Sequence, residues 1–197
     1  MKKCLYTVCL FLFFYQISFS QSPTQVDSLW RQALAIKNDS LKAVEVCKMA
    51  NIFYDIGNRP AMEKAITLAR KIFVKVKPVS AEVNLFRLLA DVNGDAGDVK
   101  KRILYNDSII IVSKKAGFTL GEGIGSMGKA MAYARDGNMD GALKLLKPAI
   151  KIFEQQKEDG HLASAYKTMG NLLLQSRKAK EAIISYKLSA DILKKIK

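Results

Sequence analysis

One spacing recurs along most of this chain and restricts the folds that are open to it. A shift of 40 residues aligns a series of small residues, and seven positions further on it aligns a series of turn residues. The small residues are Ala50, Ala90, Ala130 and Gly170, and the turn positions are Gly57, Gly97, Gly137 and Arg177. A fixed period of about 20 to 50 residues indicates stacked supersecondary units that share one hydrophobic core.

Each unit is predicted to form a helix hairpin. In the first unit, residues 41–56 carry apolar side chains at three-and-four spacing, which is typical of a helix. We expect Asp39 or Ser40 to cap its start and Gly57 to end it in a left-handed conformation. Pro60 fits the first turn of the partner helix. Further helices are predicted at 26–36, 60–76, 80–92 (capped by Ser80), 119–136, 140–156, 161–176 and 179–196, with a turn at 94–98.

The last unit, residues 163–197, resembles a tetratricopeptide repeat. The matching residues are Tyr166, Met169, Gly170, Leu173, Ala182, Tyr186 and Ser189, and the third unit keeps Ala130, Tyr133, Gly137, Ala142, Leu146 and Ala149. The second unit departs from the pattern, because Arg102 and Asn106 stand where small and aromatic residues are usual, and we expect a one-residue slip there. The period also exceeds the family's usual length of about 34 residues. The resemblance implies an all-α, right-handed α-solenoid of about four helix-turn-helix repeats.

Three parts are expected along the chain: a signal peptide at 1–20, a leading helix within 21–40, and a repeat domain at 41–197. The repeats are placed at about 43–82, 83–122, 123–162 and 163–197.

The first twenty residues have the pattern of a secretory signal. Lys2 and Lys3 precede an apolar run that is short for a membrane-spanning helix, which needs about 20 apolar residues. The small residues Ser18 and Ser20 suit cleavage after Ser20. We therefore expect a periplasmic or secreted protein, and the alternative is an uncleaved leader that anchors the chain in the membrane.

Charge and cysteine content narrow the partners. From Gln21 onward the chain has 30 basic and 18 acidic residues, a net charge of +12, which favours anionic partners. Export and the even spread of the basic residues over all repeats argue against nucleic acid. Cys47 is the only cysteine left after cleavage, so no internal disulfide can form, and a buried hydrophobic role is favoured over a reactive thiol.

Gly123 to Ala130 offers the sharpest enzymatic alternative. The segment matches the dinucleotide fingerprint and nearly matches a phosphate-binding loop, with Ser108–Val112 as the preceding strand. However, Ala130 replaces the hydroxyl that would hold magnesium, and no second strand with an acidic end follows. We therefore expect no nucleotide cofactor. The glycines instead predict a frayed helix start near 121–125, because each glycine in a helix costs up to about 1 kcal/mol.

The remaining candidates for chemistry are weaker. Asp91, Asn93 and Asp95 copy the opening of a calcium loop, but Arg102 stands where the loop needs a bidentate glutamate. His161 is the only histidine, and no cysteine or histidine pair has metal-ligand spacing. The sequence therefore predicts a non-enzymatic protein with no catalytic residues, no metal and no cofactor.

In the family that this chain resembles, the first helices of the hairpins line a concave groove for the ligand. The resemblance implies groove positions at Asn51, Tyr54, Arg87, Asp91, Met127, Met131, Lys167 and Asn171. Lys167 and Asn171 lie one helical turn apart and resemble half of the carboxylate clamp by which some members hold a peptide C-terminus. An ordinary solvated pair is the simpler interpretation. Met127 and Met131 belong either to an adaptable apolar patch or to the core.

Two functions fit these expectations. The first is an exported scaffold that binds a protein or peptide with acidic or C-terminal carboxylate groups. The second is the export-side sensory portion of a tetratricopeptide-containing sensor histidine kinase or regulator, which the long-period repeats resemble. The last helix is expected to leave apolar surface open at Ala179, Ile183, Tyr186 and Ala190, which predicts a continuation of the chain, a docked partner or self-association.

Overall fold

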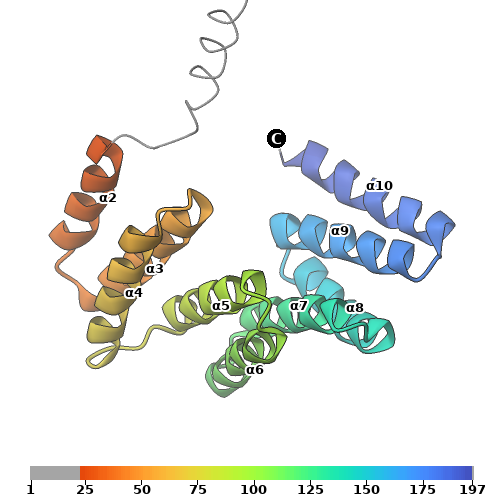
Figure 1. Ribbon diagram of the computed structural model, residues 1–197, viewed down its shortest axis with the longest axis horizontal. Coiled ribbons are helices and arrows are strands. Elements are labelled where there is room, and N and C mark those ends of the chain that lie inside the picture. The colour runs from red at the N-terminus through yellow and green to blue at the C-terminus, as the bar shows by residue number, and fades with distance from the viewer. Residues whose placement is uncertain (1–22, 197) are drawn as a thin grey trace, which may run out of the picture. The chain divides into compact units, whose positions relative to one another are not determined.

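The computed structural model describes residues 23–196, which form helices and no strand (Figure 1). The predicted all-α fold class is confirmed; the predicted signal peptide lies outside the described residues. The helices are α2 (Pro23–Ala35), α3 (Asp39–Asp55), α4 (Arg59–Phe73), α5 (Val79–Asp95), α6 (Val99–Ala116), α7 (Thr119–Arg135), α8 (Met139–Gln155), α9 (Asp159–Gln175) and α10 (Ala179–Lys195). None of these helices is long and apolar enough to cross a membrane. The chain divides into two compact units between Val76 and Lys77.

The first unit is built on the hairpin of α3 and α4. The buried face of α3 carries Val46, Met49, Ala50 and Phe53, which follow the predicted spacing. α2 packs against α3, and the rings of Trp30 and Phe53 lie 6.0 Å apart between their centroids. The core of this unit is therefore formed by α3 packed against both α4 and α2.

Two helix boundaries in the first unit differ from prediction. The N-cap of α3 is Asn38, not Asp39 or Ser40: its side chain accepts from the Leu41 N–H at 3.0 Å. The helix starts at Asp39, two residues earlier than expected, so Asp39 lies in the first turn, where its charge is favourable. α4 ends at Phe73 and not near 76. Pro78 does not explain the earlier end, because a proline disfavours helical backbone only at the residue directly before it, here Lys77. The N–H groups of Lys75 and Val76 both donate to the Ile72 carbonyl and close the last turn.

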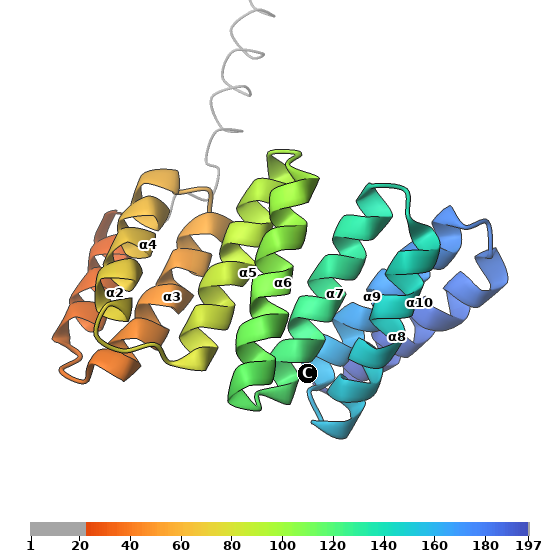
Figure 2. The ribbon, with the colours of Figure 1, turned by 90° about the horizontal axis from the view of Figure 1, so that it is seen from below.

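The second unit contains three antiparallel hairpins, α5 with α6, α7 with α8, and α9 with α10 (Figures 1 and 2). Successive hairpins pack through α6 against α7 and α8 against α9, while α7 also contacts both α5 and α9. A cluster of buried hydrophobic residues lies where α7, α8 and α9 meet, and it includes Leu146, Phe153 and Leu172. α7 is therefore the central helix of this unit.

The hairpin turns follow the repeat. Gly57, Gly97 and Gly137 all have positive φ, as predicted, while Arg177 adopts φ 59° at the same position without being glycine. The next residue caps the second helix in three hairpins and fails to do so in the last. Asn58, Asp98 and Asn138 accept from the N–H groups of Ala61, Lys101 and Gly141, and Lys178 makes no side-chain cap bond.

Two predictions about α5 are wrong. Ser80 does not cap this helix: the N-cap is Pro78, which has extended backbone and no side-chain cap bond. Gly94 is not part of the turn but a buried residue inside the helix. The reason is Arg102 of α6, whose side chain packs so closely that a Cβ at Gly94 would lie 2.9 Å from its Cδ.

The expected one-residue slip in α6 is also wrong. Arg102 and Asn106 are buried at the positions that Ala142 and Leu146 occupy one repeat later, so the register is kept. Arg102 lays its stem on Gly94 and brings its guanidinium within 3.8 Å of the Asp91 carboxylate. The buried Asn106 amide donates to its own helix, to the Arg102 carbonyl at 2.8 Å. The helix is not shifted, although Arg102 Nε is buried and has no hydrogen-bond partner among the described residues.

α7 does not fray at its glycines. It is helical from Thr119, and Gly121, Gly123 and Gly125 are buried. A Cβ at Gly123 would lie 2.9 Å from Phe153 of α8, and one at Gly125 would lie 2.8 Å from Ile110 of α6. The glycines thus let α7 approach both neighbouring helices, and this packing outweighs their low helix propensity.

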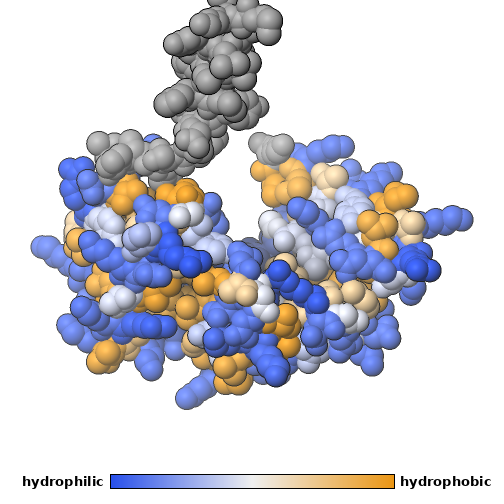
Figure 3. Space-filling view, viewed as in Figure 1, coloured by the Kyte–Doolittle hydropathy of each residue, from blue (hydrophilic) through white to orange (hydrophobic). Residues whose placement is uncertain are grey.

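α10 leaves large apolar side chains exposed. They are Ile183, Ile184, Leu188 and Leu193, and Ile196 follows the end of the helix. Ile183, Ile184 and Leu188 form what we call the exposed face of α10. Figure 3 shows hydrophobic side chains over this helix among mostly hydrophilic neighbours. Tyr186 does not belong to the exposed face as predicted, because its ring packs on Gly170 of α9.

Candidate functional site

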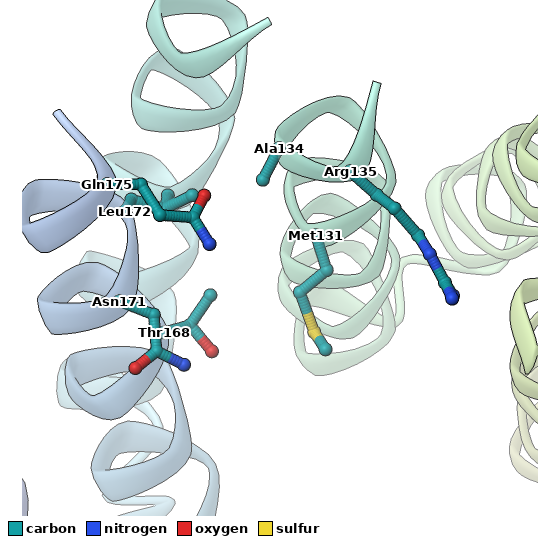
Figure 4. Close-up of a pocket in the computed structure, with 7 residues that line it drawn as sticks. All are labelled: Met131, Ala134, Arg135, Thr168, Asn171, Leu172 and Gln175. Atoms are coloured by element: carbon teal, nitrogen blue, oxygen red, sulfur yellow. The ribbon is translucent and has the colours of Figure 1, made fainter. Parts of the chain in front are cut away.

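An open cavity of about 220 Å³ lies between α7 and α9 in the second unit. α7 contributes Met131, Ala134 and Arg135, and α9 contributes Thr168, Asn171, Leu172 and Gln175 (Figure 4). Both sets follow the three-and-four spacing of a single helix face. We call this surface the α7–α9 groove.

The groove combines an apolar floor with polar side chains from one helix. Met131, Ala134 and Leu172 supply apolar surface, and Met131 is exposed despite its size. Thr168, Asn171 and Gln175 carry hydroxyl and amide groups, and Figure 4 shows these side chains extending from α9 toward α7. Amides and hydroxyls both donate and accept hydrogen bonds, so the groove can pair with the backbone of a bound peptide.

A hydrogen bond from α10 orients the central amide of the groove. The Tyr186 hydroxyl donates to Asn171 Oδ1 at 2.7 Å. Figure 4 shows the Asn171 oxygen turned away from α7 and its nitrogen turned toward the groove. Asn171 therefore presents N–H donors to a ligand.

Arg135 serves a different purpose from the other lining residues. Its guanidinium donates to the Gly94 carbonyl oxygen at the end of α5. Figure 4 shows the side chain running away from α9 and toward α5. Arg135 thus ties α7 to α5, and its stem, not its charge, borders the groove.

The structure brings together two of the predicted groove residues, Met131 and Asn171. Lys167 is exposed on α9 one turn before Asn171, outside the lining of the cavity. The two methionines separate: Met127 packs against the core of the second unit, whereas Met131 lines the groove. The core interpretation therefore applies to Met127, and the apolar-patch interpretation applies to Met131.

The other four predicted groove residues lie elsewhere. Arg87 is exposed on α5, and Asp91 on the same helix faces Arg102. Asn51 and Tyr54 are half-buried on α3 in the first unit, and the Asn51 amide donates to the Cys47 carbonyl at 2.8 Å. None of the four lines the α7–α9 groove.

Sequence reasoning missed five lining residues: Ala134, Arg135, Thr168, Leu172 and Gln175. Gln175 follows Asn171 by four residues, and Ala134 and Arg135 follow Met131 by three and four. Extending the predicted face by one further turn on each helix would have found these three. Predicting that Thr168 and Leu172 line the groove would have required knowledge of how α9 is rotated against α7.

The nucleotide-binding alternative is contradicted by the structure. Ser108–Val112 lies within α6 and not on a strand, and Gly123 to Ala130 lies within α7, so no loop is available to surround a phosphate. Lys129 pairs with Asp107 of α6, with 2.7 Å between Nζ and Oδ1. That hydrogen bond raises the pKa of Lys129 above its ordinary value, so the ammonium is committed to a structural ion pair.

The weaker candidates also have structural roles. Asp91, Asn93 and Asp95 lie within the last turns of α5, where residues two apart point to different sides of the helix and cannot form a calcium loop. The His161 ring stacks on Phe153 with 5.3 Å between centroids, and its Nδ1 lies 3.6 Å from a Glu158 carboxylate oxygen. Among residues 23–196, no group of three or more His, Cys, Asp or Glu side chains is placed to hold a metal ion.

Comparisons with known proteins agree with this architecture. Residues 125–195, which span most of α7 to α10, match the family model described as tetratricopeptide repeat. A comparison with curated proteins finds no match.

Solved structures show the same fold at low sequence identity, and twelve chains match. The crystal structure of BtubC (BKLC) from P. vanneervenii aligns with a TM-score of 0.65 and 15% identity, over 85% of this chain and 68% of that chain. The apo form of RapI aligns with a TM-score of 0.68 and 16% identity, over 87% of this chain. This chain spans only 63% of RapI. These likenesses concern the fold alone.

Proposed function

We propose that this chain, which is a tetratricopeptide repeat protein, is a non-enzymatic scaffold that binds an extended protein or peptide segment in the α7–α9 groove. The observation that carries the proposal is the groove itself, where Asn171 offers oriented N–H donors beside the exposed Met131. The Gln175 amide and the Thr168 hydroxyl extend the polar row along α9. A peptide backbone pairs with that row while an apolar side chain rests on Met131 and Leu172.

The ligand's carboxylate is proposed to lie beside Lys167. This lysine is exposed one turn from Asn171, so the two side chains reach the same part of a ligand. A lysine and an amide together provide charge-assisted hydrogen bonds to a carboxylate. Arg135 is not assigned this role, because its guanidinium is held by Gly94.

A peptide library with free C-terminal carboxylates tests the groove, with the affinity of each selected peptide measured by fluorescence anisotropy. Asn171→Ala should weaken binding by about tenfold, the equivalent of one well-formed hydrogen bond. Lys167→Gln should weaken the binding of peptides with a free C-terminal carboxylate more than the binding of the same peptides with a C-terminal amide. Lys180→Gln removes the same charge from an exposed site on α10 and is the matched control. If the Asn171→Ala and Lys180→Gln variants bind the peptides with the same affinity, the groove is not the binding site.

The exposed apolar residues of α10 indicate a second binding surface on the same scaffold. Ile183, Ile184 and Leu188 expose apolar side chains that folded monomers usually cover. We propose that this face takes part in self-association or docks another protein. Sedimentation velocity of wild type and Ile184→Glu tests self-association: identical monomeric profiles at high concentration would exclude it.

Export remains a proposal that rests on the leader-like pattern at 1–20. Expression with an alkaline phosphatase fusion, followed by intact mass analysis, tests it. Cleavage near Ser20 is supported if the measured mass is that of a chain beginning at Gln21 and the fusion shows phosphatase activity on the export side. An exported chain that keeps its leader favours the membrane-anchored alternative, which suits the sensory portion of a longer regulator.

A further inference from the structure

A second cavity of about 490 Å³ lies between α2 and α4 in the first unit. Its volume is within the usual range for small-molecule sites, about 300 to 1,000 Å³. α2 contributes Trp30 and Leu34, and α4 contributes Lys64, Thr67, Leu68 and Lys71. Thr67, Leu68 and Lys71 follow Lys64 by three, four and seven positions, so the four residues from α4 form one continuous helix face. This surface, the α2–α4 cavity, belongs to a different unit from the α7–α9 groove.

Side chains of residues 23–196 do not fill the apolar part of the α2–α4 cavity. α2 packs against α3, where the rings of Trp30 and Phe53 are in contact, and Ala33 of α2 is buried. One turn beyond Trp30, Leu34 is still 55% exposed beside the cavity. Trp30, Leu34 and Leu68 therefore form an apolar wall that an occupant with a hydrocarbon chain or ring can cover.

Two lysines border this apolar wall. The Lys64 ammonium lies 4.7 Å from the centroid of the Trp30 ring, which holds the charge in place at the edge of the cavity. Lys71 follows two helical turns later, about 10 Å along the helix axis. The lining contains no acidic residue, and within residues 23–196 no carboxylate forms an ion pair with either lysine. The charge of the cavity is thus complementary to an anion.

We propose that the α2–α4 cavity binds a small amphiphilic carboxylate. The hydrocarbon part lies on Trp30, Leu34 and Leu68, and the carboxylate lies between the two lysines. Lys64 is already held in place by the indole, so little side-chain freedom is lost when the anion arrives. The site is independent of the α7–α9 groove, because the two surfaces share no residue.

Trp30 makes this proposal directly measurable. It is the single tryptophan of the chain, so fluorescence excited at a wavelength that the seven tyrosines do not absorb reports on the surroundings of Trp30. Decanoate, at concentrations where it is monomeric, is the probe, with decanol and decylamine as its neutral and cationic counterparts. We expect a saturable change in Trp30 emission with decanoate, weaker binding of decanol, and none of decylamine. Binding of decanoate should weaken as salt is raised.

Variants assign the binding to the two lysines. Lys64→Gln and Lys71→Gln should each raise the dissociation constant of decanoate by about three- to tenfold, as expected for exposed charges. Lys75→Gln is the matched control: it removes the same charge from an exposed residue outside the cavity. Equilibrium dialysis with labelled decanoate repeats the measurement for Lys64→Gln, whose substitution also alters the surroundings of the fluorophore.

Three results would overturn the proposal: no saturable signal, equal affinity for decanol and decanoate, or equal loss of affinity in Lys75→Gln. Asn171→Ala should leave decanoate binding unchanged. Failure of decanoate binding would therefore leave the peptide-binding proposal standing, and the reverse also holds.

Discussion

The Tyr186 hydroxyl on α10 donates a hydrogen bond to Asn171 Oδ1 on α9, with 2.7 Å between the two oxygens. The bond fixes which end of the amide faces the α7–α9 groove. Because its oxygen is engaged, Asn171 offers its nitrogen to a ligand. The binding chemistry of α9 therefore depends on α10, a helix that does not itself line the cavity.

Tyr186→Phe should weaken peptide binding by about threefold and leave the fold intact. The substitution removes only the hydroxyl, so Asn171 becomes free to rotate, while the loss of one exposed hydrogen bond lowers the free energy of unfolding by no more than about 1 kcal/mol. Fluorescence anisotropy and thermal denaturation measure the two effects. Tyr166→Phe is the control, because that hydroxyl donates to Glu154 at 2.9 Å, away from the groove. Wild-type affinity in both variants would show that the Asn171 orientation plays no part.

Gly128→Ala should destabilise the second unit. A Cβ at Gly128 would lie 1.9 Å from Oδ1 of the buried Asn106, so α6 and α7 must move apart or the amide must give up its position. Such overpacking lowers the free energy of unfolding by about 1 to 3 kcal/mol, more than the gain of about 1 kcal/mol in helix propensity. Urea denaturation measures the difference.

Gly160→Ala is the matched control for Gly128→Ala. Gly160 also lies in a helix, but a Cβ there would meet no atom within 4 Å. We expect it to be neutral or to raise the free energy of unfolding by up to about 1 kcal/mol. If the two variants change stability by the same amount, the contact between Gly128 and Asn106 is not what excludes a larger side chain.

Two substitutions in the turn of the last hairpin should stabilise the protein. Arg177 has φ 59°, which is costly for a residue with a Cβ, and Lys178 provides no cap bond. The double variant Arg177→Gly, Lys178→Asn copies the turns of the first and third hairpins and should raise the free energy of unfolding by about 1 kcal/mol. Lys180→Asn introduces the same side chain inside α10 and should give no gain. A double variant no more stable than wild type would refute this interpretation of the turn.

Cys47 should be inert in the folded protein. Its side chain is fully buried, and burial raises the pKa of the thiol to about 12 from 9.0. In a variant with Cys4 and Cys9 replaced by serine, Ellman's reagent should react with Cys47 only after urea is added. Fast reaction without urea would contradict the buried position.

The same shift of the Cys47 pKa predicts a pH dependence of stability. The folded pKa is raised, so the contribution of the neutral thiol is complete below about pH 9 and declines between about pH 9 and 12, where only the unfolded chain ionises. The slope approaches about 1.4 kcal/mol per pH unit. Cys47→Ala should lose stability less steeply over this interval, measured by urea denaturation at each pH.

Much of the fold was predictable because it is local. The positive φ at Gly57, Gly97 and Gly137 follows from turn chemistry within a few residues. The buried face of α3 follows from spacing along a single helix. The prediction failed at Arg102, Asn106 and the glycines of α7, because each of these residues is explained by a contact with another helix.

The sequence by itself determined the helix hairpins, their period and the positions of their turns, because these depend on hydrogen bonds and apolar spacing within about one repeat. Only the tertiary structure decided which residues share a site. Met131 and Asn171 line one cavity from two helices, Arg135 donates to the Gly94 carbonyl, and the Lys64 ammonium lies over the Trp30 ring. Each of these relationships depends on the rotation and separation of packed helices, which side-chain volumes at distant positions set jointly and no single segment encodes.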